Sequence, residues 1–226
     1  MVFETKIVSH REVAKETHEV AFERPTSFAF KAGQYMQVAV PRLIQSDVKG
    51  ASRLFSIASS PYDLKILRIV FRVTGSGFKE TLRALPIGST VVLEQAVGNF
   101  SLSQALALPQ VFVAGGVGIS PFMSYLQQSV PNEWEQPITL LYGNQNPESA
   151  AYLLELKQMV IQQKRFSLTE IYKRPTLELF MKAASKHSDA LWFVVGPPAM
   201  TALTVNGLRA GGIVPEHIHT ESFEGY

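Results

Sequence analysis

Three glycines interrupt an apolar run at residues 111–122, which reads Val-Phe-Val-Ala-Gly-Gly-Val-Gly-Ile-Ser-Pro-Phe. The apolar residues before the glycines are typical of a strand buried on both faces, and the glycines let the backbone turn sharply and approach a ligand closely. Ser120 is expected to cap the helix that follows, with Pro121 in its first turn. Because free amides and the positive end of the helix dipole would meet at this turn, the segment predicts a diphosphate-binding site. Close packing of the strand against the helix is the alternative explanation of the glycines.

The chain around this turn divides into two halves with different hydrophobic periodicity. Short alternating runs occupy the first half, at residues 3–9, 18–22, 34–40, 53–58, 66–73 and 90–94, with one short helix expected near 79–84. This pattern predicts an N-terminal six-stranded antiparallel barrel. From residue 109 onward, expected strands (111–114, 138–142, 167–171 and 191–195) take turns with expected helices (121–128, 148–162, 177–184 and 199–209). This alternation predicts an α/β domain with a doubly wound parallel sheet, and we expect domains at residues 1–103 and 104–226.

Composition narrows the possible functions. The formal net charge of +2 among 226 residues gives no reason to expect a nucleic-acid or anionic-membrane partner. No apolar stretch reaches the roughly 20 residues of a membrane-spanning helix. The first residues do not resemble a signal peptide, so we expect a cytoplasmic protein. The absence of cysteine excludes disulfides, a cysteine nucleophile and thiolate-bound zinc or iron–sulfur clusters within this chain. The five histidines do not form a metal-ligand pattern, and we expect no metal site.

An arginine-containing motif in the first half resembles that of a known family. Residues 53–59, Arg-Leu-Phe-Ser-Ile-Ala-Ser, are similar to the Arg-x-Tyr-Ser signature of the ferredoxin–NADP reductase superfamily. Other segments that resemble motifs of this family follow its order along the chain: Ala-Gly-Gln-Tyr at 32–35, Gly-Asn-Phe at 98–100, the glycine turn, Leu-Leu-Tyr-Gly at 140–143, Gly-Pro-Pro-Ala-Met at 196–200 and Glu-Ser-Phe-Glu-Gly-Tyr at 221–226. The resemblance implies that the barrel binds FAD, that the second domain binds NADP or NAD, and that the chain is an FAD-dependent NAD(P)H oxidoreductase.

The resemblance assigns flavin contacts to residues 53–56. Arg53 would bind the diphosphate through its planar, permanently charged fork of donors, with a surface ion pair as the alternative. Phe55 would lie against the isoalloxazine ring, and Ser56 would hydrogen-bond near its hydride-accepting N5 atom, with Leu54 beside them in the motif. Ordinary strand alternation also accounts for a Phe next to a Ser. Phe55 replaces the usual Tyr, as in the free-flavin reductases of this superfamily.

A second glycine-containing segment, at residues 75–82, is also similar to a flavin-binding motif of the family. The short helix expected there would present the amides of Gly77, Phe78 and Lys79 to the flavin diphosphate. Lys79 stands where family members carry Ser or Thr, and its side chain is expected either to bind phosphate or to point to solvent. Arg72, on the preceding strand, is a further candidate flavin contact, with a solvated strand residue as the alternative.

The resemblance also assigns residues of the second domain. The nucleotide diphosphate would be lined by Gly115, Gly116, Val117 and Gly118, with Ser120, close to the flavin, and Pro121 after them. The carboxyl ends of the strands would be shaped by Gly196, Pro197, Pro198 and Met200. Near the flavin, the resemblance places Glu221, Phe223 and Tyr226. Tyr226 would stack on the exposed flavin face, unless the terminus is frayed. The implied catalytic residues are therefore Ser56, Phe55, Glu221 and Tyr226.

The sequence specifies the flavin-binding motifs more closely than it specifies the nucleotide or the electron acceptor. No acidic residue comes just after Tyr142-Gly143 to bind a ribose 2′-hydroxyl, while Lys173 and Arg174 follow the next expected strand, so the sequence leans toward NADPH over NADH. Ferredoxin, flavodoxin, a cytochrome, a quinone, oxygen and free flavin all remain open as external electron acceptors.

Two other functions remain open. The second hypothesis is an NAD(P)H:free-flavin reductase, distinguished by whether FAD stays bound. The third is a non-catalytic electron-transfer or regulatory subunit of a larger complex. It is motivated by Phe55, Lys79 and Val195, which depart from the family pattern, Val195 replacing a Cys.

Overall fold

The computed structural model describes the chain except residues 103–106, 130–133 and 223–226. The described residues form two compact units. The first contains Met1–Leu102 together with Ser120–Gln128, and the second contains the remainder. Segment 120–128, which the sequence pattern places in the second half, is thus grouped with the first unit. The expected boundary between residues 103 and 104 stays a prediction.

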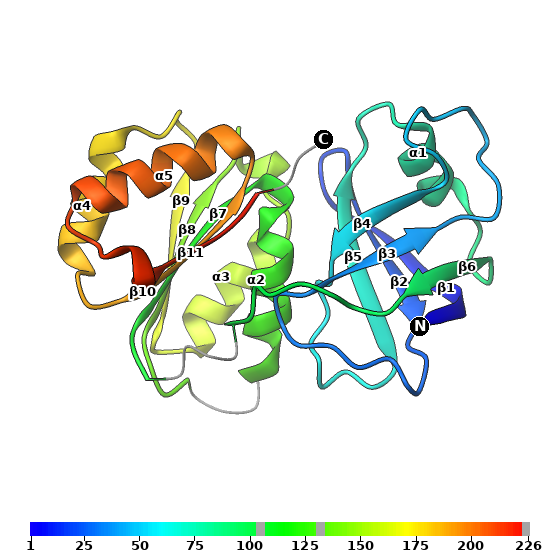
Figure 1. Ribbon diagram of the computed structural model, residues 1–226, viewed down its shortest axis with the longest axis horizontal. Helices are drawn as coiled ribbons and strands as arrows, with labels where there is room; N and C mark the ends of the chain where they lie inside the picture. The colour runs from blue at the N-terminus through cyan, green and yellow to red at the C-terminus, as the bar shows by residue number, and fades with distance from the viewer. Residues whose placement is uncertain (103–106, 130–133, 223–226) are drawn as a thin grey trace. The chain divides into compact units, whose positions relative to one another are not determined.

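The first unit is built on a six-stranded antiparallel sheet (Figure 1). Its strands are β1 (Val2–Ala14), β2 (Thr17–Glu23), β3 (Tyr35–Ala39), β4 (Ser52–Ser56), β5 (Ile66–Arg72) and β6 (Thr90–Glu94), in the order β4-β3-β6-β1-β2-β5. Just past β4, Ile57 bridges Ile69 of β5, and the Ala58 amide donates to the Arg68 carbonyl oxygen at 2.8 Å. These contacts join the two outer strands, so the predicted six-stranded antiparallel barrel is confirmed.

Strand β1 is longer than the sequence pattern predicted because it pairs with two neighbours. Residues Val2 to Lys6 pair with β6, whereas Ile7 to Ala14 pair with β2. The register shifts within the β2 pairing, both after Ile7 and after Glu12. Such irregularities bend a strand and break its strict alternation. One 13-residue strand therefore serves both neighbours, although only its first part alternates clearly.

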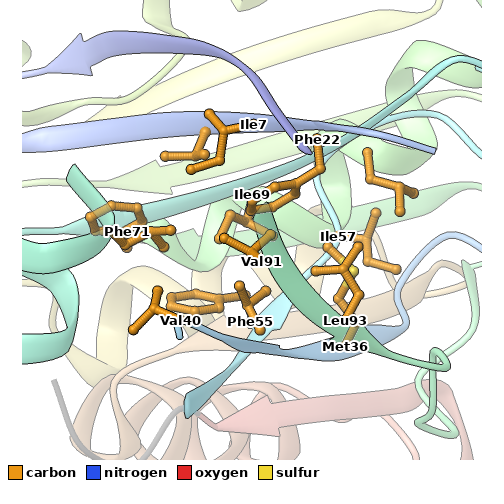
Figure 2. Packing of buried hydrophobic residues seen from close by; sticks show 14 of the residues in the cluster. Ile7, Phe22, Met36, Val40, Phe55, Ile57, Ile69, Phe71, Val91 and Leu93 are labelled. Atoms are coloured by element: carbon orange, nitrogen blue, oxygen red, sulfur yellow. The ribbon is translucent and has the colours of Figure 1, made fainter. Parts of the chain in front are cut away.

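Alternate side chains of the strands fill the barrel interior (Figure 2). Its most deeply buried members include Ile7, Phe22, Met36, Ile57, Ile69, Phe71, Val91 and Leu93, each no more than 1% exposed. Helix α1 (Gly77–Ala84) adds Phe78 and Leu82 to this core. These two residues are four apart and so lie on the same face of the helix. The core therefore fixes the orientation of α1 within the first unit.

The helix after the glycine turn begins differently from the expectation. A 3₁₀ turn, η2 (Gly116–Ile119), runs directly into α2 (Ser120–Leu126), which is followed by a second 3₁₀ turn, η3 (Gln127–Ser129). Ser120 therefore lies inside a helical run and does not take the N-cap position. Every residue of α2 is buried. Within the first unit, the Phe122 ring packs edge-on against Phe100 at 6.4 Å, and the Ser124 hydroxyl donates to the Ser59 carbonyl oxygen at 2.7 Å.

The second unit contains a five-stranded parallel sheet. Its strands are β7 (Gln110–Gly115), β8 (Ile138–Gly143), β9 (Phe166–Ile171), β10 (Leu191–Gly196) and β11 (Ile218–Ser222), in the order β11-β10-β7-β8-β9. Figure 1 shows α4 (Leu177–Lys186) and α5 (Pro198–Ala210) on one face of the sheet and α3 (Leu153–Gln162) on the other. The predicted doubly wound parallel sheet is therefore confirmed.

The second unit differs in two places from the expected alternation of strands and helices. The helix expected at residues 148–162 is divided into a 3₁₀ turn, η4 (Pro147–Ser149), and α3, because Tyr152 adopts a φ of 61°. A right-handed helix cannot continue through that conformation. Strand β11, preceded by η5 (Pro215–His217), adds a fifth strand to the four of the strand–helix alternation, in the segment where alternating His217 and His219 predict a strand. Among the described helices, none has the length and apolar character needed to cross a membrane.

Candidate functional site

The N-terminus of α1 holds an anion that the chain itself supplies. Ser76 is the N-cap residue, and its hydroxyl and the Phe78 amide donate to Asp47 Oδ2 at 2.6 and 3.0 Å. The Lys49 amide donates to Asp47 Oδ1 at 2.9 Å, and Arg53 Nη2 forms an ion pair with the same oxygen. The Asp47 side chain is only 5% exposed. The hydrogen bond from Ser76, followed by those from the two amides, holds the pKa of this carboxyl well below its usual range.

Arg53 lies against the same helix end. Its Nη1 donates to the carbonyl oxygens of Lys49, Gly50 and Ser52 at 2.8, 3.0 and 2.6 Å. Its guanidinium carbon lies 5.3 Å from the centre of the Phe78 ring. The structure therefore brings the predicted arginine to the predicted helix N-terminus.

Lys79 and Arg72, two more of the predicted flavin contacts, add positive charge near this helix end. Lys79 is 4% exposed, with Nζ 3.5 Å from Thr74 Oγ1, so it does not point to solvent. Burial, followed by the positive charges of Arg53, Lys49 and Arg72, lowers the pKa of Lys79 to about 8. A donor set that already binds a carboxylate at a helix N-terminus, with cations in excess, fits the diphosphate of FAD.

Strand β4 places the motif residues in different surroundings. Phe55 is 7% exposed, and its ring centre lies 5.9 Å from that of Phe71 and 6.0 Å from that of Phe78, on which it stacks. Leu54 is 58% exposed. Ser56 is buried, and its Oγ has no hydrogen-bond partner within the described part of the chain. Because a buried hydroxyl without a partner is destabilising, this oxygen fits a contact to the polar edge of a bound flavin.

Ser56→Ala is expected to stabilise the cofactor-free protein by about 1 kcal/mol, because it removes a buried hydroxyl with no partner. The same change should slow flavin reduction by NADPH about tenfold, since the lost hydrogen bond is worth about 1.4 kcal/mol. Thermal unfolding and stopped-flow absorbance measure the two effects. The control is Ser59→Ala. The Ser59 hydroxyl accepts a hydrogen bond from the Arg68 amide at 3.1 Å, so this variant should lose stability without a change in the rate of flavin reduction. A Ser56→Ala variant that is less stable but equally fast would contradict the assignment.

A second group of predicted residues gathers in the second unit, at the carboxyl ends of β7 and β10. After β7 the chain proceeds to β8 on one side, and β10 later pairs with β7 on the other side. Parallel sheets bind ligands outside the strand ends at such a switch point. The glycine turn begins at Gly115, the last residue of β7, and the Gly-Pro-Pro-Ala-Met segment begins at Gly196, the last residue of β10, so these two motifs come together.

The glycines at this switch point serve two purposes. A Cβ on Gly115 would lie 2.6 Å from Met200 Sδ, one on Gly118 would lie 2.5 Å from a backbone oxygen of β10, and one on Gly196 would lie 2.6 Å from Met200 Cε. Close packing against rigid backbone therefore accounts for Gly118, whereas Gly115 and Gly196 pack against the movable end of the Met200 side chain. Gly116 has a φ of +54° and no atom within 4 Å of its Cβ position. Gly116 is therefore the glycine of this turn with open space beside it, and its carbonyl oxygen accepts from the Tyr142 hydroxyl at 3.2 Å.

The other predicted contacts near the turn differ in exposure. Pro197 and Pro198 are exposed at the start of α5, and Val117 is partly buried. Ser120 and Pro121 are buried in α2.

Glu221 lies on β11, in register with Val195 of β10. Its Oε2 is buried and has no hydrogen-bond partner among the residues that the structure describes. Burial raises the pKa of Glu221 to about 7. This carboxyl can therefore gain or lose a proton near neutral pH at the carboxyl edge of the sheet.

Glu221→Gln is expected to become increasingly stable relative to the unmodified protein as pH rises. The folded-state pKa of about 7 exceeds the ordinary value of 4.5, so the folded state binds the proton more tightly and ionisation opposes folding. The stability from the protonated carboxyl is present below pH 4.5 and is lost as pH rises through 7. The free-energy difference in favour of Gln should grow by about 2 kcal/mol between pH 5 and pH 8.5. Denaturant unfolding at both pH values tests this, and an unchanged difference would contradict it.

Residues after β8 and β9 bear on nucleotide choice. The Asn144 amide donates to the Ile171 carbonyl oxygen at 2.9 Å, and both polar side-chain atoms of Asn144 are buried without a partner in the described ranges. Lys173 and Arg174 are exposed just after β9. Because β8 and β9 are parallel neighbours, these residues share one edge of the sheet. The preference for NADPH stays a prediction.

Phe223 and Tyr226, which the resemblance places near the flavin, lie outside the described residues. Within the described ranges, no group of three or more His, Asp or Glu side chains is arranged to hold a metal ion. Asp47 is not among the residues predicted from the sequence. Residues 47–50, Asp-Val-Lys-Gly, form a turn in which the Gly50 amide donates to the Asp47 carbonyl oxygen at 2.9 Å. Turn chemistry could have predicted this bend, but not its distant partners.

Known proteins resemble this chain in sequence over most of its length. The family model for the oxidoreductase NAD-binding domain matches residues 112–206. Ferredoxin–NADP reductase B of Sorangium cellulosum is 28% identical over 247 residues, covering 98% of each chain. Terephthalate 1,2-dioxygenase reductase component 2 of a Comamonas species is 31% identical over 154 residues, which are 67% of this chain and 44% of that protein. This chain therefore spans less than half the length of the second relative.

Solved structures show the same fold. A ferredoxin NADP+ reductase of Neisseria gonorrhoeae with bound FAD and NADP has a TM-score of 0.81 at 21% identity, covering 98% of both chains. The ferredoxin-NADP+ reductase of Plasmodium falciparum has a TM-score of 0.81 at 19% identity, covering 98% of this chain and 96% of that one. Together with the ordered motifs, the family model and the Sorangium relative place the chain in the ferredoxin–NADP reductase superfamily of FAD- and NAD(P)-binding oxidoreductases.

Proposed function

We propose that this chain is an FAD-dependent oxidoreductase that transfers electrons from NADPH to an external acceptor. The observation that carries the proposal is that one chain combines a helix N-terminus that binds an anion with a glycine turn at the switch point of a parallel sheet. The helix is α1, whose N-terminus with Arg53 already binds a carboxylate. The glycine turn is the one that contains Gly116. When bound, FAD supplies the redox chemistry, since it takes up a hydride and releases electrons singly.

Residues of the first unit bind and orient the flavin in this proposal. Arg53 and the amides at the start of α1 bind the diphosphate, and Lys79 adds positive charge beside them. Ser56 offers its buried hydroxyl to the ring. Phe55 packs against Phe78, and this packing fixes the strand that carries Ser56.

Residues of the second unit bind the nucleotide and handle protons. Gly116 lets the backbone approach the nucleotide diphosphate. Glu221, with a pKa of about 7, holds or releases a proton at the carboxyl edge of the sheet. From the family resemblance alone, Tyr226 is proposed to stack on the exposed flavin face, with Phe223 near the flavin.

The acceptor is proposed to be a separate molecule, with ferredoxin or flavodoxin first among the candidates. No cysteine is present to hold an iron–sulfur cluster in this chain. The name of the Sorangium relative favours ferredoxin. The test is NADPH-driven reduction of added ferredoxin, flavodoxin or cytochrome by the FAD-reconstituted protein. Electron transfer that needs FAD supports the proposal, and no transfer to any acceptor contradicts it.

A free-flavin reductase is the second candidate, and the Asp47 contact favours it. Donors suited to the diphosphate are engaged by this carboxylate, which would make FAD exchangeable. FAD that leaves on desalting, with activity restored only by added flavin, would support this candidate over the first.

A further inference from the structure

Residues 44–50, called the strap below, lie across the N-terminus of α1 in the first unit. The Ile44 amide donates to Thr81 Oγ1 at 3.0 Å and so fastens one end of the strap to the helix. A Cβ on Gly77 would lie 2.6 Å from the carbonyl oxygens of both Gln45 and Ser46. The absence of a side chain at Gly77 therefore admits the backbone of the strap to this helix end.

Asp47 of the strap uses the donors that a phosphate group would use. Its carboxylate accepts from the Ser76 hydroxyl and the Phe78 amide, and it pairs with Arg53 Nη2. Amides at helix N-termini and arginine forks bind carboxylates and phosphates alike. While Asp47 is in place, these donors are not free for a second anion.

The strap also holds Arg53 from its other side. The carbonyl oxygens of Lys49 and Gly50 accept from Arg53 Nη1. The side chains of Ile44 and Val48, by contrast, are 66% and 104% exposed. The strap is therefore held mainly by polar contacts at this helix end, and its release would uncover little apolar core.

We propose that Asp47 is an internal competitor for the flavin diphosphate, so that the strap releases these donors when FAD binds. This inference rests on the proposed function. A diphosphate beside the Asp47 carboxylate would be repelled, whereas Arg53 and Lys79 without that carboxylate would attract it. Asp47 would thus weaken the binding of phosphorylated flavins without affecting the flavin ring.

The test compares FAD with riboflavin, which carries no phosphate, on the cofactor-free full-length protein. Asp47→Asn keeps the shape of the side chain and removes its charge. We expect this variant to bind FAD at least tenfold more tightly and riboflavin within twofold of the unmodified protein, both measured by flavin fluorescence quenching. Its melting temperature without cofactor should fall, because the ion pair and charged hydrogen bonds of Asp47 are lost. If the Asn variant is unfolded by far-UV circular dichroism, Asp47→Ser takes its place.

Asp63→Asn is the matched control. Asp63 is another loop aspartate of the first unit, which accepts the Lys65 amide at 3.0 Å and pairs with Arg68 at 3.2 Å. Its replacement should leave the ratio of FAD to riboflavin affinity unchanged. An Asp47→Asn variant with an unchanged ratio, or with weaker FAD binding, overturns the inference.

Inorganic pyrophosphate, titrated by calorimetry, probes the donor set without the flavin. Tighter pyrophosphate binding by Asp47→Asn supports the competition, even if neither protein binds FAD, and in that case it is the proposed function that fails. Equal pyrophosphate binding by the two proteins overturns the competition, even if both bind FAD.

Discussion

Arg53→Ala should lower the affinity of the protein for FAD about a hundredfold, because charge-assisted hydrogen bonds of this kind are worth about 1.5–3 kcal/mol. The planar fork of Arg53 lies over Phe78 at the N-terminus of α1, where it already pairs with a carboxylate. Arg53→Lys keeps the charge but loses the fork, so we expect a loss of about tenfold. Equilibrium titration with FAD, followed by flavin fluorescence, measures both variants.

Arg68→Ala is the control for this experiment. Arg68 is another arginine of the barrel and pairs with Asp63 at 3.2 Å, so its removal should leave FAD affinity unchanged. Because Arg53 and Asp47 form an ion pair, their effects should not add when both are replaced. If the Arg53→Ala variant is folded and binds FAD normally, Arg53 serves only in a structural ion pair and does not bind FAD.

Gly118→Ala should destabilise the second unit by about 3 kcal/mol. An added methyl group that meets a rigid neighbour falls at the upper end of the destabilisation caused by overpacking. A Cβ at this position would lie 2.5 Å from the carbonyl oxygen and 2.9 Å from the carbonyl carbon of Val195. Both atoms belong to the backbone of β10 and cannot rotate away. Both tryptophans of the chain, Trp134 and Trp192, are buried in the second unit, so tryptophan fluorescence during denaturation reports on that unit.

Two other glycines separate packing from ligand binding. A Cβ on Gly143 would lie 3.6 Å from its nearest atom, which is an ordinary contact. We therefore expect Gly143→Ala to lower the free energy of unfolding by less than about 1 kcal/mol. Gly116→Ala has open space but a φ of +54°, so it should cost about 1 kcal/mol. It should also weaken NADPH binding, measured by titration. If Gly118→Ala is as stable as the unmodified protein but no longer binds NADPH, the packing explanation of Gly118 is wrong.

The regular parts of the fold could be predicted because hydrophobic periodicity is a local signal. Alternation located all six strands of the barrel, and the change to alternating strands and helices located the parallel sheet. The full length of β1 could not be read in this way, because register shifts after Ile7 and Glu12 break the alternation. The division of the expected helix 148–162 was also hidden, since nothing in the pattern shows that Tyr152 adopts a positive φ.

The candidate site was predictable in its donors but not in their partners. The family resemblance pointed to Arg53 and to the start of α1, and the structure brings these residues together, while their contact with flavin stays a prediction. Asp47 lies 29 residues before Ser76, and only the folded barrel reveals that its carboxylate reaches that helix end. The same limit applies to the glycine turn. Its sequence allows both packing and ligand binding, and only the neighbouring atoms separate Gly118 from Gly116.

The proposed function requires that this chain hold FAD and reduce it with a nicotinamide nucleotide. The most direct test is an anaerobic absorbance titration of the FAD-reconstituted, desalted protein, first with NADPH and then separately with NADH. We expect the absorbance band of the retained flavin to bleach with about one equivalent of NADPH and to bleach less readily with NADH. Retained FAD that neither nucleotide reduces would contradict the claim and would favour a non-catalytic subunit.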